Sequence, residues 1–294
     1  MTAPPRALRH HAPPSRGILR QWKADAPQQR LRVLPPEELA PYVHHFWSLR
    51  WSVTAPIVTE ALPYPCVSVV FEELAGVARA EIAGPRTSRV TKVVVGEGRV
   101  FGLTFRPGAF APLAEGSMAK LTNRVVPVGA VFGARGERWA EATHAEPEVD
   151  GRIALATAFL EPLLPPLPKE VERVRDLVEA MASDRSILKV DDAYGASGLD
   201  ARTLQRHFRR FVGVSPKWAL QRFRLLEAVE RLKAPNPPSL AELAASLEYA
   251  DQAHFARDFR RMIGETPRRF VARFHGEGDE EERGERAPPF ARER

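Results

Sequence analysis

The sequence predicts an α+β protein, with a β-rich N-terminal domain and its covering helices followed by an all-α C-terminal domain. Two patterns lead to this prediction. Between residues 44 and 105, short runs of β-branched and aromatic residues alternate with Gly and Pro, which is typical of strands and turns. From residue 169 onward, apolar residues recur at helical spacing instead. A chain of 294 residues is long enough for two domains with separate cores.

The N-terminal domain is expected over residues 31–165, with five or more strands in a sheet or small barrel. Helices are expected on its cover, and a proline cluster at 165–168 marks its end. The expected strands are residues 44–53, 66–72, 78–84, 90–96 and 100–105, and the expected helices are residues 35–43, a segment starting at 107, and residues 151–164.

Three further segments are assigned from composition. Residues 1–30 are rich in Pro, Arg and His without periodicity, and residues 276–294 are highly charged with little apolar content. Both are expected to be disordered because they cannot bury enough apolar surface to fold. Residues 166–186 are expected to form a linker helix, which leaves residues 187–275 as the helical domain.

The helical domain contains one pattern twice. Each copy has a short helix, a tight turn and a second helix carrying Arg-x-Phe-Arg-Arg, which begins at Arg206 and again at Arg257. Each copy then continues with Gly and, three residues later, Pro. Such a duplication indicates one structural unit built twice, and two short helices around a tight turn form a helix-turn-helix.

The net charge of +6 is concentrated in this doubled unit. Residues 185–275 hold 17 Lys and Arg against 10 Asp and Glu, whereas the remaining residues hold 26 against 27. A basic domain attached to a nearly neutral one indicates a polyanion-binding module joined to something else.

The second helix of each copy has the two faces that a DNA-reading helix needs. In the first copy Asp200 is expected to cap the helix, and in the second copy Ser239 caps the shorter helix that comes before. Arg can pair with guanine and Gln with adenine through two hydrogen bonds each. The apolar faces are Leu204, Phe208 and Phe211 in the first copy, and Phe255, Phe259, Met262 and Ile263 in the second. The polar faces are Arg202, Gln205, Arg206 and Arg209, and Gln252, His254, Arg257 and Arg261.

Each of these assignments has a plainer alternative. A basic helix face can simply be solvated, but here the duplication favours DNA reading. His254 fits equally well as a residue packed beside the turn, and Asp258 is expected to be a solvated carboxylate rather than an acceptor for cytosine. The helix from Pro216 to Lys233, about 27 Å long at roughly 1.5 Å per residue, could hold the two copies about one turn of B-DNA apart.

The doubled pattern resembles the C-terminal domain of the AraC/XylS family of bacterial transcription regulators. The resemblance implies that the third and sixth helices read bases. It matches base-reading roles to Arg202, Gln205 and Arg206 in the first copy and to Gln252, His254 and Arg257 in the second. Phosphate contacts are expected from Arg209, Arg210, Lys217, Arg261 and Arg268. One departure is Glu248, which stands where the family usually has Gly. Glycine would supply a positive φ at little cost there, so either the turn differs slightly or Glu248 adopts a positive φ with a small strain.

The N-terminal domain resembles an uncharacterised domain that accompanies AraC-type modules. The resemblance rests on the stretches starting at Pro41, Gly84 and Thr104, and it names no ligand. No catalytic site, cofactor or metal site is predicted. Cys66 reads as a buried structural residue in a strand, and His44 and His45 are expected to point to opposite faces of their strand. Trp47, Trp51, Tyr64 and Phe101 could line a pocket but fit a core better.

The sequence therefore predicts a transcriptional regulator that binds promoter DNA with sequence specificity and is not an enzyme. A small-molecule effector, RNA polymerase and a second copy of the chain are further candidate partners. No apolar run could span a bilayer and no secretory signal is evident, so a cytoplasmic location is expected. Two rival hypotheses are an alkyl-acceptor DNA repair protein using Cys66 and a non-specific architectural DNA binder.

Overall fold

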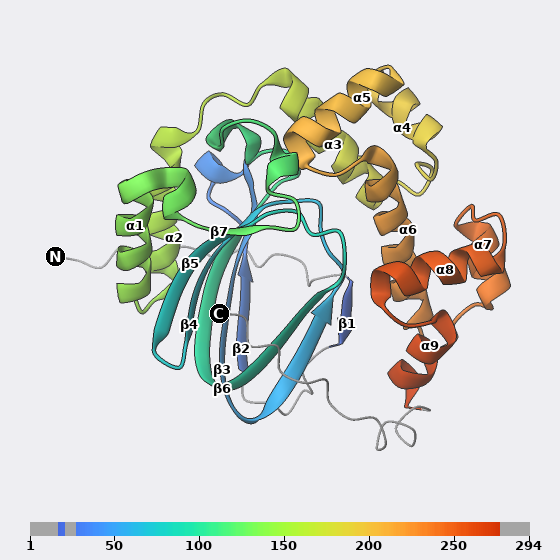
Figure 1. Ribbon diagram of the computed structural model, residues 1–294, viewed down its shortest axis with the longest axis horizontal. Helices are drawn as coiled ribbons and strands as arrows, with labels where there is room; N and C mark the ends of the chain where they lie inside the picture. The colour runs from blue at the N-terminus through green and yellow to red at the C-terminus, as the bar shows by residue number, and fades with distance from the viewer. Residues whose placement is uncertain (1–16, 21–27, 277–294) are drawn as a thin grey trace.

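The structure is a computed structural model that describes residues 17–20 and 28–276 (Figure 1). The sequence prediction for the charged tail falls almost wholly outside this range. The prediction of disorder for residues 1–30 is wrong for its described parts, because Ile18–Arg20 forms strand β1 and Gln28–Val33 forms β2. Both strands pair with β3, so the sheet takes up the backbone groups that face this strand.

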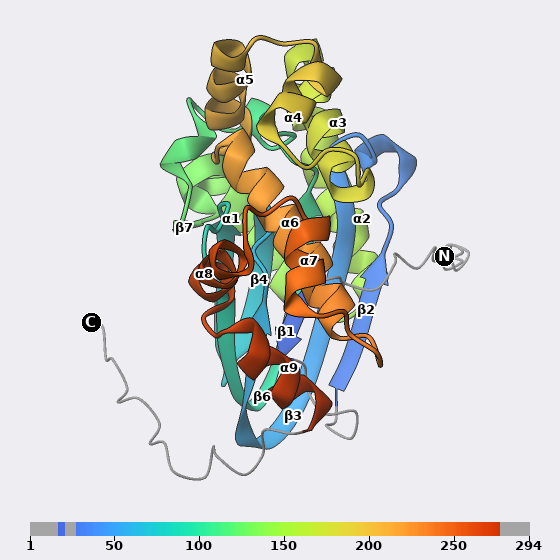
Figure 2. The same ribbon diagram turned by 90° about the vertical axis from the view of Figure 1, so that its right-hand side faces the viewer.

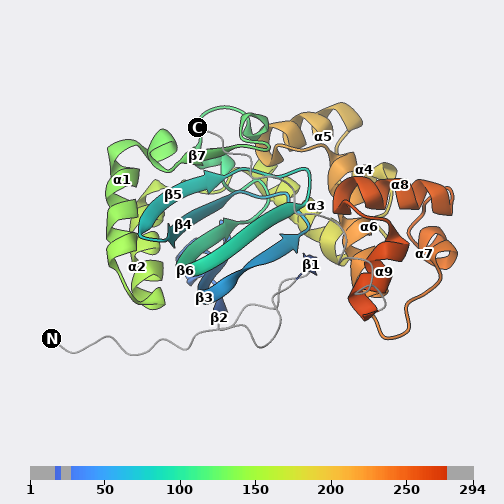
Figure 3. The same cartoon turned by 60° about the horizontal axis from the view of Figure 1, so that its bottom comes forward.

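Within the described residues the N-terminal domain holds a seven-stranded antiparallel sheet in the order β1-β3-β6-β4-β5-β7, with β2 also paired to β3. Two long strands, β3 (Val43–Ala61) and β6 (Val90–Phe105), form its centre. The shorter strands are β4 (Ser68–Leu74), β5 (Val77–Ala83) and β7 (Val125–Pro127). The α+β prediction is confirmed, as a sheet and a helical region lie side by side (Figure 3).

One long strand, β6, replaces the two strands expected at 90–96 and 100–105. The prediction placed a turn between the two strands, at Gly96 and Gly98, but Gly98 and also Gly102 allow close packing across the sheet. A Cβ on Gly98 would lie 2.2 Å from the indole of Trp51, and one on Gly102 would lie 2.5 Å from that of Trp47. Each tryptophan sits opposite its glycine in the β3–β6 register. Glycine therefore leaves room here for an aromatic ring on the neighbouring strand.

The helices expected at residue 35 and residue 107 are short 3-10 turns: η1 (Glu37–Leu39), η2 (Ala111–Leu113) and η3 (Met118–Lys120). Longer helices α1 (Gly129–Ala145) and α2 (Val149–Leu160) follow, and a 3-10 turn, η4 (Glu161–Leu163), ends the region. Trp139 of α1 packs edge-on against Phe71 of β4, with ring centroids 4.9 Å apart. The α1–α2 pair thereby buries one face of the sheet (Figure 1).

The C-terminal helices share one apolar core and lie beside the sheet on the side away from α1 and α2 (Figure 1), so they stand in front of the sheet in Figure 2. Helix α3 contributes Val174, Leu177 and Val178 to this core, so the helix expected as a linker packs as part of the helical domain. The elements are α3 (Lys169–Ser183), α4 (Val190–Ser197), α5 (Ala201–His207), the π-helical turn η5 (Phe208–Val212), α6 (Pro216–Leu232), α7 (Leu240–Ser246), α8 (Gln252–Ile263) and α9 (Pro267–His275).

Candidate DNA-binding interface

The two sequence repeats fold into two helix-turn-helix units with matching second helices. In the first unit α5 and η5 run without a break from Ala201 to Val212, and in the second α8 runs from Gln252 to Ile263. An aspartate caps each of them: Asp200 accepts from the Thr203 amide at 2.9 Å, and Asp251 from the His254 amide at 2.6 Å. Both caps satisfy amides that the helix itself leaves free.

The repeats also match where these helices end. Gly213 and Gly264 adopt φ angles of 87° and 91°, a left-handed conformation that ends a helix at little cost only for glycine. The next helix then begins with a capping hydroxyl, from Ser215 in the first unit and Thr266 in the second, followed by proline. The repeated Gly and Pro in the sequence are therefore a helix stop and a helix start.

The apolar faces pack as predicted. Leu204 and Phe208 are fully buried, and Phe211 packs partly buried against the same core. In the second unit the four predicted apolar residues are all buried, with Phe255 and Phe259 fully so. Burial of these faces fixes the rotation of both helices, and the opposite faces are left to the solvent.

The polar side chains proposed as base readers are exposed in both units, with His254 as the exception. Arg206 makes only a weak contact with its neighbour Thr203, at 3.5 Å, so its guanidinium stays available to a ligand. The exposed candidates for base contacts are Arg202, Gln205, Arg206, Gln252 and Arg257, and those for phosphate contacts are Arg209, Arg210, Lys217, Arg261 and Arg268.

His254 is half-buried and engaged with the turn before its helix. Its ring packs edge-on against Tyr249 with centroids 5.2 Å apart, and its Nε2 lies 3.6 Å from a carboxylate oxygen of Asp258. The alternative in which His254 packs beside the turn therefore describes its place in this structure. A base contact would require the side chain to leave Asp258.

Asp258 is not the solvated carboxylate that the sequence predicted. It is 6 % exposed, accepts a hydrogen bond from Gln221 of α6, and pairs with Arg261 at 2.7 Å. These partners satisfy a carboxylate that would otherwise be costly to bury. The side chain joins α8 to α6 and does not reach toward solvent.

Glu248 adopts the positive φ that the sequence raised as an alternative. Its φ is 57°, close to the 64° of Gly198 in the turn of the first unit. Its carboxylate pairs with Lys189 at 2.8 Å, which ties the turn of the second unit to the start of α4 in the first. The turn keeps its left-handed shape although a side chain is present.

The sequence prediction missed Arg260. It is exposed on α8 and occupies the position that corresponds to Arg209, since both are the first arginine of the Arg-Arg pair in the repeated motif. Aligning the two repeats residue by residue would have added it to the candidates for phosphate contacts.

Helix α6 connects the two units as a single 17-residue helix, about 26 Å long at roughly 1.5 Å per residue. The predicted apolar positions pack into the core, with Trp218 partly buried and Leu220, Phe223, Leu226, Val229 and Leu232 buried. A helix anchored on both units along its length fixes their separation.

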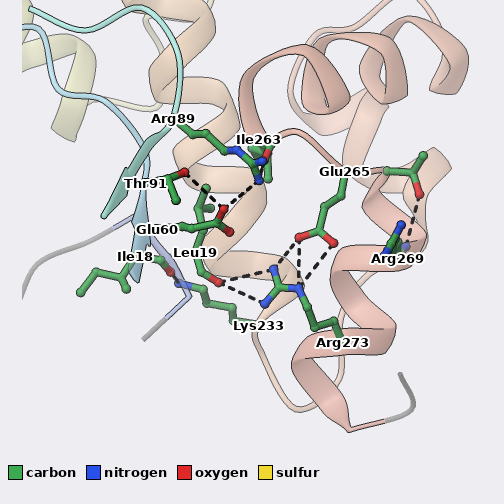
Figure 4. A network of polar contacts seen from close by, with 11 residues as sticks. Ile18, Leu19, Glu60, Arg89, Thr91, Lys233, Ile263, Glu265, Arg269 and Arg273 are labelled. Atoms are coloured by element: carbon green, nitrogen blue, oxygen red, sulfur yellow. Dashed lines mark hydrogen bonds and ion pairs between the residues drawn. The ribbon is translucent and has the colours of Figure 1, made fainter. Parts of the chain in front are cut away.

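The N-terminal domain contacts the C-terminal end of both candidate reading helices. At the first helix, Thr122 Oγ1 donates to the carbonyl of Gly213 at 2.7 Å and Ser117 Oγ to that of Arg209 at 2.8 Å. At the second, Arg89 Nη1 donates to the carbonyl of Ile263 at 3.1 Å and also pairs with Glu60 at 3.0 Å (Figure 4). Both helices are thus tied to one sheet domain.

Further contacts strengthen this junction. Arg273 of α9 and Lys233 donate to the carbonyls of Leu19 and Ile18 in β1 (Figure 4). Arg222 of α6, 2 % exposed, donates to the carbonyl of Pro63 at 2.6 Å and lies over the ring of Tyr64. A shift in the sheet domain would therefore reach the helices that carry the basic faces.

Cys66 is buried, as the structural interpretation predicted, but it lies in a bend before β4 and not in the strand itself. Burial raises the pKa of its thiol to about 12, and the nearby Arg222 offsets only part of this shift. A thiol that stays protonated at neutral pH is a poor nucleophile. This environment does not favour alkyl transfer to Cys66.

His44 and His45 do not point apart as expected. An irregularity in the β3–β6 register between Val43 and His45 turns the two side chains toward each other, and their Nδ1 atoms lie 2.8 Å apart. The assumption of strict strand alternation fails at this bulge. Among the described residues, no group of three or more His, Cys, Asp and Glu could hold a metal ion.

The four aromatic residues considered as pocket candidates serve packing. Trp51 and Phe101 are buried in the sheet domain, Trp47 packs beside Trp51, and Tyr64 packs against Phe223 of α6. In the described part of the chain, no helix is both long and apolar enough to cross a bilayer.

Comparison with known proteins also separates an N-terminal part of the chain from a C-terminal part. Residues 31–127 match a domain of unknown function (DUF6597), and residues 195–273 match a helix-turn-helix domain family. The transcriptional activator RhaS of Pectobacterium carotovorum is 34 % identical over 70 residues, which are 24 % of this chain and 25 % of that protein. The transcriptional activator NphR of a Rhodococcus species is 29 % identical over 119 residues, which are 38 % of this chain and 35 % of that protein. The chain thus spans about a quarter to a third of these curated relatives.

Two solved structures are also similar to this chain. A probable AraC-family transcriptional regulator from Rhodopseudomonas palustris is 28 % identical, covering 35 % of this chain and 97 % of that one, with a TM-score of 0.32. ToxT of Vibrio cholerae is 10 % identical, covering 83 % of this chain and 97 % of that one, with a TM-score of 0.38. From the sequence matches and the doubled fold, the C-terminal part of the chain is a helix-turn-helix domain of the AraC type.

Proposed function

We propose that this protein is a DNA-binding transcriptional regulator that reads promoter sequence through two adjacent major grooves. One observation carries the proposal: two 12-residue helices of matching build each bury an apolar face and expose a basic one. Helix α6, about 26 Å long, connects the two units, and we expect it to hold the reading helices about one turn of B-DNA apart. In this account Arg202, Gln205 and Arg206 read bases with the first helix, and Gln252 and Arg257 with the second.

Binding strength and specificity would come from different side chains. Arg209, Arg210, Lys217, Arg261 and Arg268 would contact phosphates, and each such contact releases counterions, so affinity falls steeply with salt. The base-facing arginines and glutamines would supply the preference for sequence. Under this proposal His254 contributes mainly by positioning the turn through Tyr249.

The N-terminal domain would act as the control element. Its direct contacts to the ends of both reading helices give a physical route by which a ligand or a second protein copy could alter DNA binding. A small-molecule effector, a second copy of the chain and RNA polymerase are the partners proposed for it. The protein would act on the DNA of the bacterial cytoplasm.

Selection of bound sequences from a random DNA pool, using the full chain near physiological salt, tests this proposal. We expect an enriched site with two short blocks about one helical turn apart. The selection is repeated with Arg206→Ala and with Arg257→Ala, and each variant should lose preference in a different block, by about 1–3 kcal/mol at the affected bases.

The architectural rival predicts the opposite pattern. Tight, salt-sensitive binding without an enriched motif, or an equal loss on all sequences in both variants, would contradict base reading. Cys66→Ser provides a separate check on the repair rival, because DNA binding and regulation should survive in that variant.

A further inference from the structure

A cavity of about 370 Å³ lies in the N-terminal domain, away from the DNA interface. It is formed where strands β2, β3 and β6 meet the start of α2. Four arginines from four elements line it: Arg30 of β2, Arg50 of β3, Arg99 of β6 and Arg152 of α2. The proposed DNA-binding function uses none of them.

Arg152 is the most deeply placed of these arginines, at 5 % exposed. Its Nε donates to the carbonyl of Glu146 at 2.8 Å, and its guanidinium carbon lies 6.0 Å from the centre of the Phe101 ring. These contacts fix the direction of the side chain. Within residues 17–20 and 28–276, the two terminal nitrogens of Arg152 donate to no protein acceptor.

Among the described residues, carboxylates do not form ion pairs with every arginine at this cavity. Arg99 is paired with Glu73 at 2.7 Å. Arg50 lies directly across the β3–β6 ladder from Arg99 and forms no ion pair in the described part of the chain. Glu148 also lines the cavity, and Glu146 directs its carboxylate to the amide of Glu148 at 2.8 Å, at the start of α2. Burial, followed by the charges of Arg99 and Arg50, lowers the pKa of Arg152.

A buried guanidinium with free donors and like-charged neighbours is stabilised when an anion occupies the space beside it. The planar fork of arginine matches the geometry of carboxylate and phosphate groups. The volume lies within the range of small-ligand pockets, and the hydroxyl of Ser48 in its wall adds a neutral donor.

We propose that this cavity binds a small molecule through a carboxylate or phosphate group held by Arg50 and Arg152. The proposal goes beyond DNA binding and does not depend on it, since the binding can be measured without DNA. Such a molecule would touch β3 and β6, the same two strands that run toward Glu60 and Arg89 at the junction with α8.

The test measures the melting temperature of the full chain while inorganic phosphate or succinate is titrated, with sodium chloride at matched ionic strength as the reference. We expect a saturable rise with at least one anion, and the comparison of the two distinguishes a phosphate group from a carboxylate. Arg50→Gln and Arg152→Gln should each raise the half-saturating concentration by about tenfold or more. Since Arg50 is exposed, its variant should fold even if the Arg152 variant does not.

Two variants with the same substitution serve as controls. Arg138→Gln removes an exposed charge from α1, and Arg206→Gln removes one from the DNA interface, so both should keep the wild-type response. A rise that does not saturate, or one that Arg50→Gln leaves unchanged, would overturn the proposal. Loss of the response in Arg206→Gln but not in Arg50→Gln would place the anion at the DNA interface and overturn it as well. Failure of the DNA selection would leave this result unaffected.

Discussion

In the second helix-turn-helix unit, backbone strain at single residues lowers the stability of the fold, and the sequence only partly predicted it. Glu248 holds a left-handed φ of 57° where glycine would be unstrained, and Lys189 pairs with its carboxylate. The strain and the ion pair oppose each other in their effects on stability. Replacing the side chain by two different small residues separates them.

We expect Glu248→Gly to melt roughly 2–4 °C above Glu248→Ala. Both variants lose the ion pair, but only glycine adopts the left-handed conformation without steric cost. Thermal unfolding followed by circular dichroism measures the difference. An alanine variant that is equally stable or more stable would show that the turn relaxes without strain.

His45 makes stability depend on pH. Burial, then the charges of Arg32 and His44, lowers its pKa from 6.5 to about 3. The unfolded chain therefore takes up a proton first as the pH falls. The contribution of His45 to stability is complete above about pH 6.5 and is lost progressively as the pH falls toward about 3.

The free energy of unfolding should consequently fall between about pH 6 and pH 4, by up to about 1.4 kcal/mol per pH unit for this group. The neighbouring His44 acts in the same direction, because burial also lowers its pKa. Urea unfolding at a series of pH values in wild type and His45→Gln checks this. A slope that is just as steep in the variant would assign the effect to other groups.

At the scale of single residues, the sequence correctly predicted the features that depend on residues close together in the chain. The caps at Asp200 and Ser239 and the apolar faces of the reading helices follow from residues a few positions apart, and they are confirmed. The burial of Asp258 could not be predicted, because its partner Gln221 is 37 positions away. The meeting of His44 and His45 depends on a bulge that only the pairing of β3 with β6 creates.

Secondary-structure elements also differ in how well the sequence predicts them. The helices of the doubled domain begin and end at capping residues, glycines and prolines that the sequence displays, whereas strand lengths depend on neighbouring strands. Strand β6 continues through glycines because Trp51 and Trp47 from β3 cover them. A glycine in a strand can mark either a turn or a close approach, and only the sheet shows which applies.

A substitution at Gly98 tests this role of glycine in β6. Gly98→Ala should destabilise the protein by about 1–3 kcal/mol, because the new Cβ would overlap the Trp51 indole. Gly195→Ala is the matched control: a Cβ there, inside α4, meets nothing within 4 Å. It should stabilise the helix by about 0.5–1 kcal/mol. Equal effects of the two changes, measured by urea unfolding, would contradict the packing role of Gly98.

At the scale of the whole molecule, the sheet domain and the C-terminal helical domain form a continuous structure. Leu19 and Leu62 of the N-terminal domain belong to the same apolar cluster as the helical core. Polar contacts from Thr122 and Arg89 then hold the two reading helices at equivalent ends. The repeats, the basic charge and the helical domain were predictable from sequence, but this junction joins segments far apart in the chain and was not.

Cutting these contacts should weaken binding to a two-block DNA site. In Arg89→Ala/Thr122→Val the reading helices are less restrained before binding, so fixing them on DNA costs additional entropy. We expect the Kd for the selected site to rise by between about two- and tenfold, with little change for a single block. Arg138→Ala serves as the control. Tighter binding by the double variant would instead identify the contacts as inhibitory.

The central claim is that a rigid α6 places two reading helices in successive major grooves of one face of the duplex. Its most direct test is the affinity of the full chain for the selected site after about five base pairs are inserted between the blocks, which rotates one block by roughly half a turn. The account predicts that affinity falls to that of a DNA carrying a single block. Undiminished binding to the DNA with the insertion would contradict it.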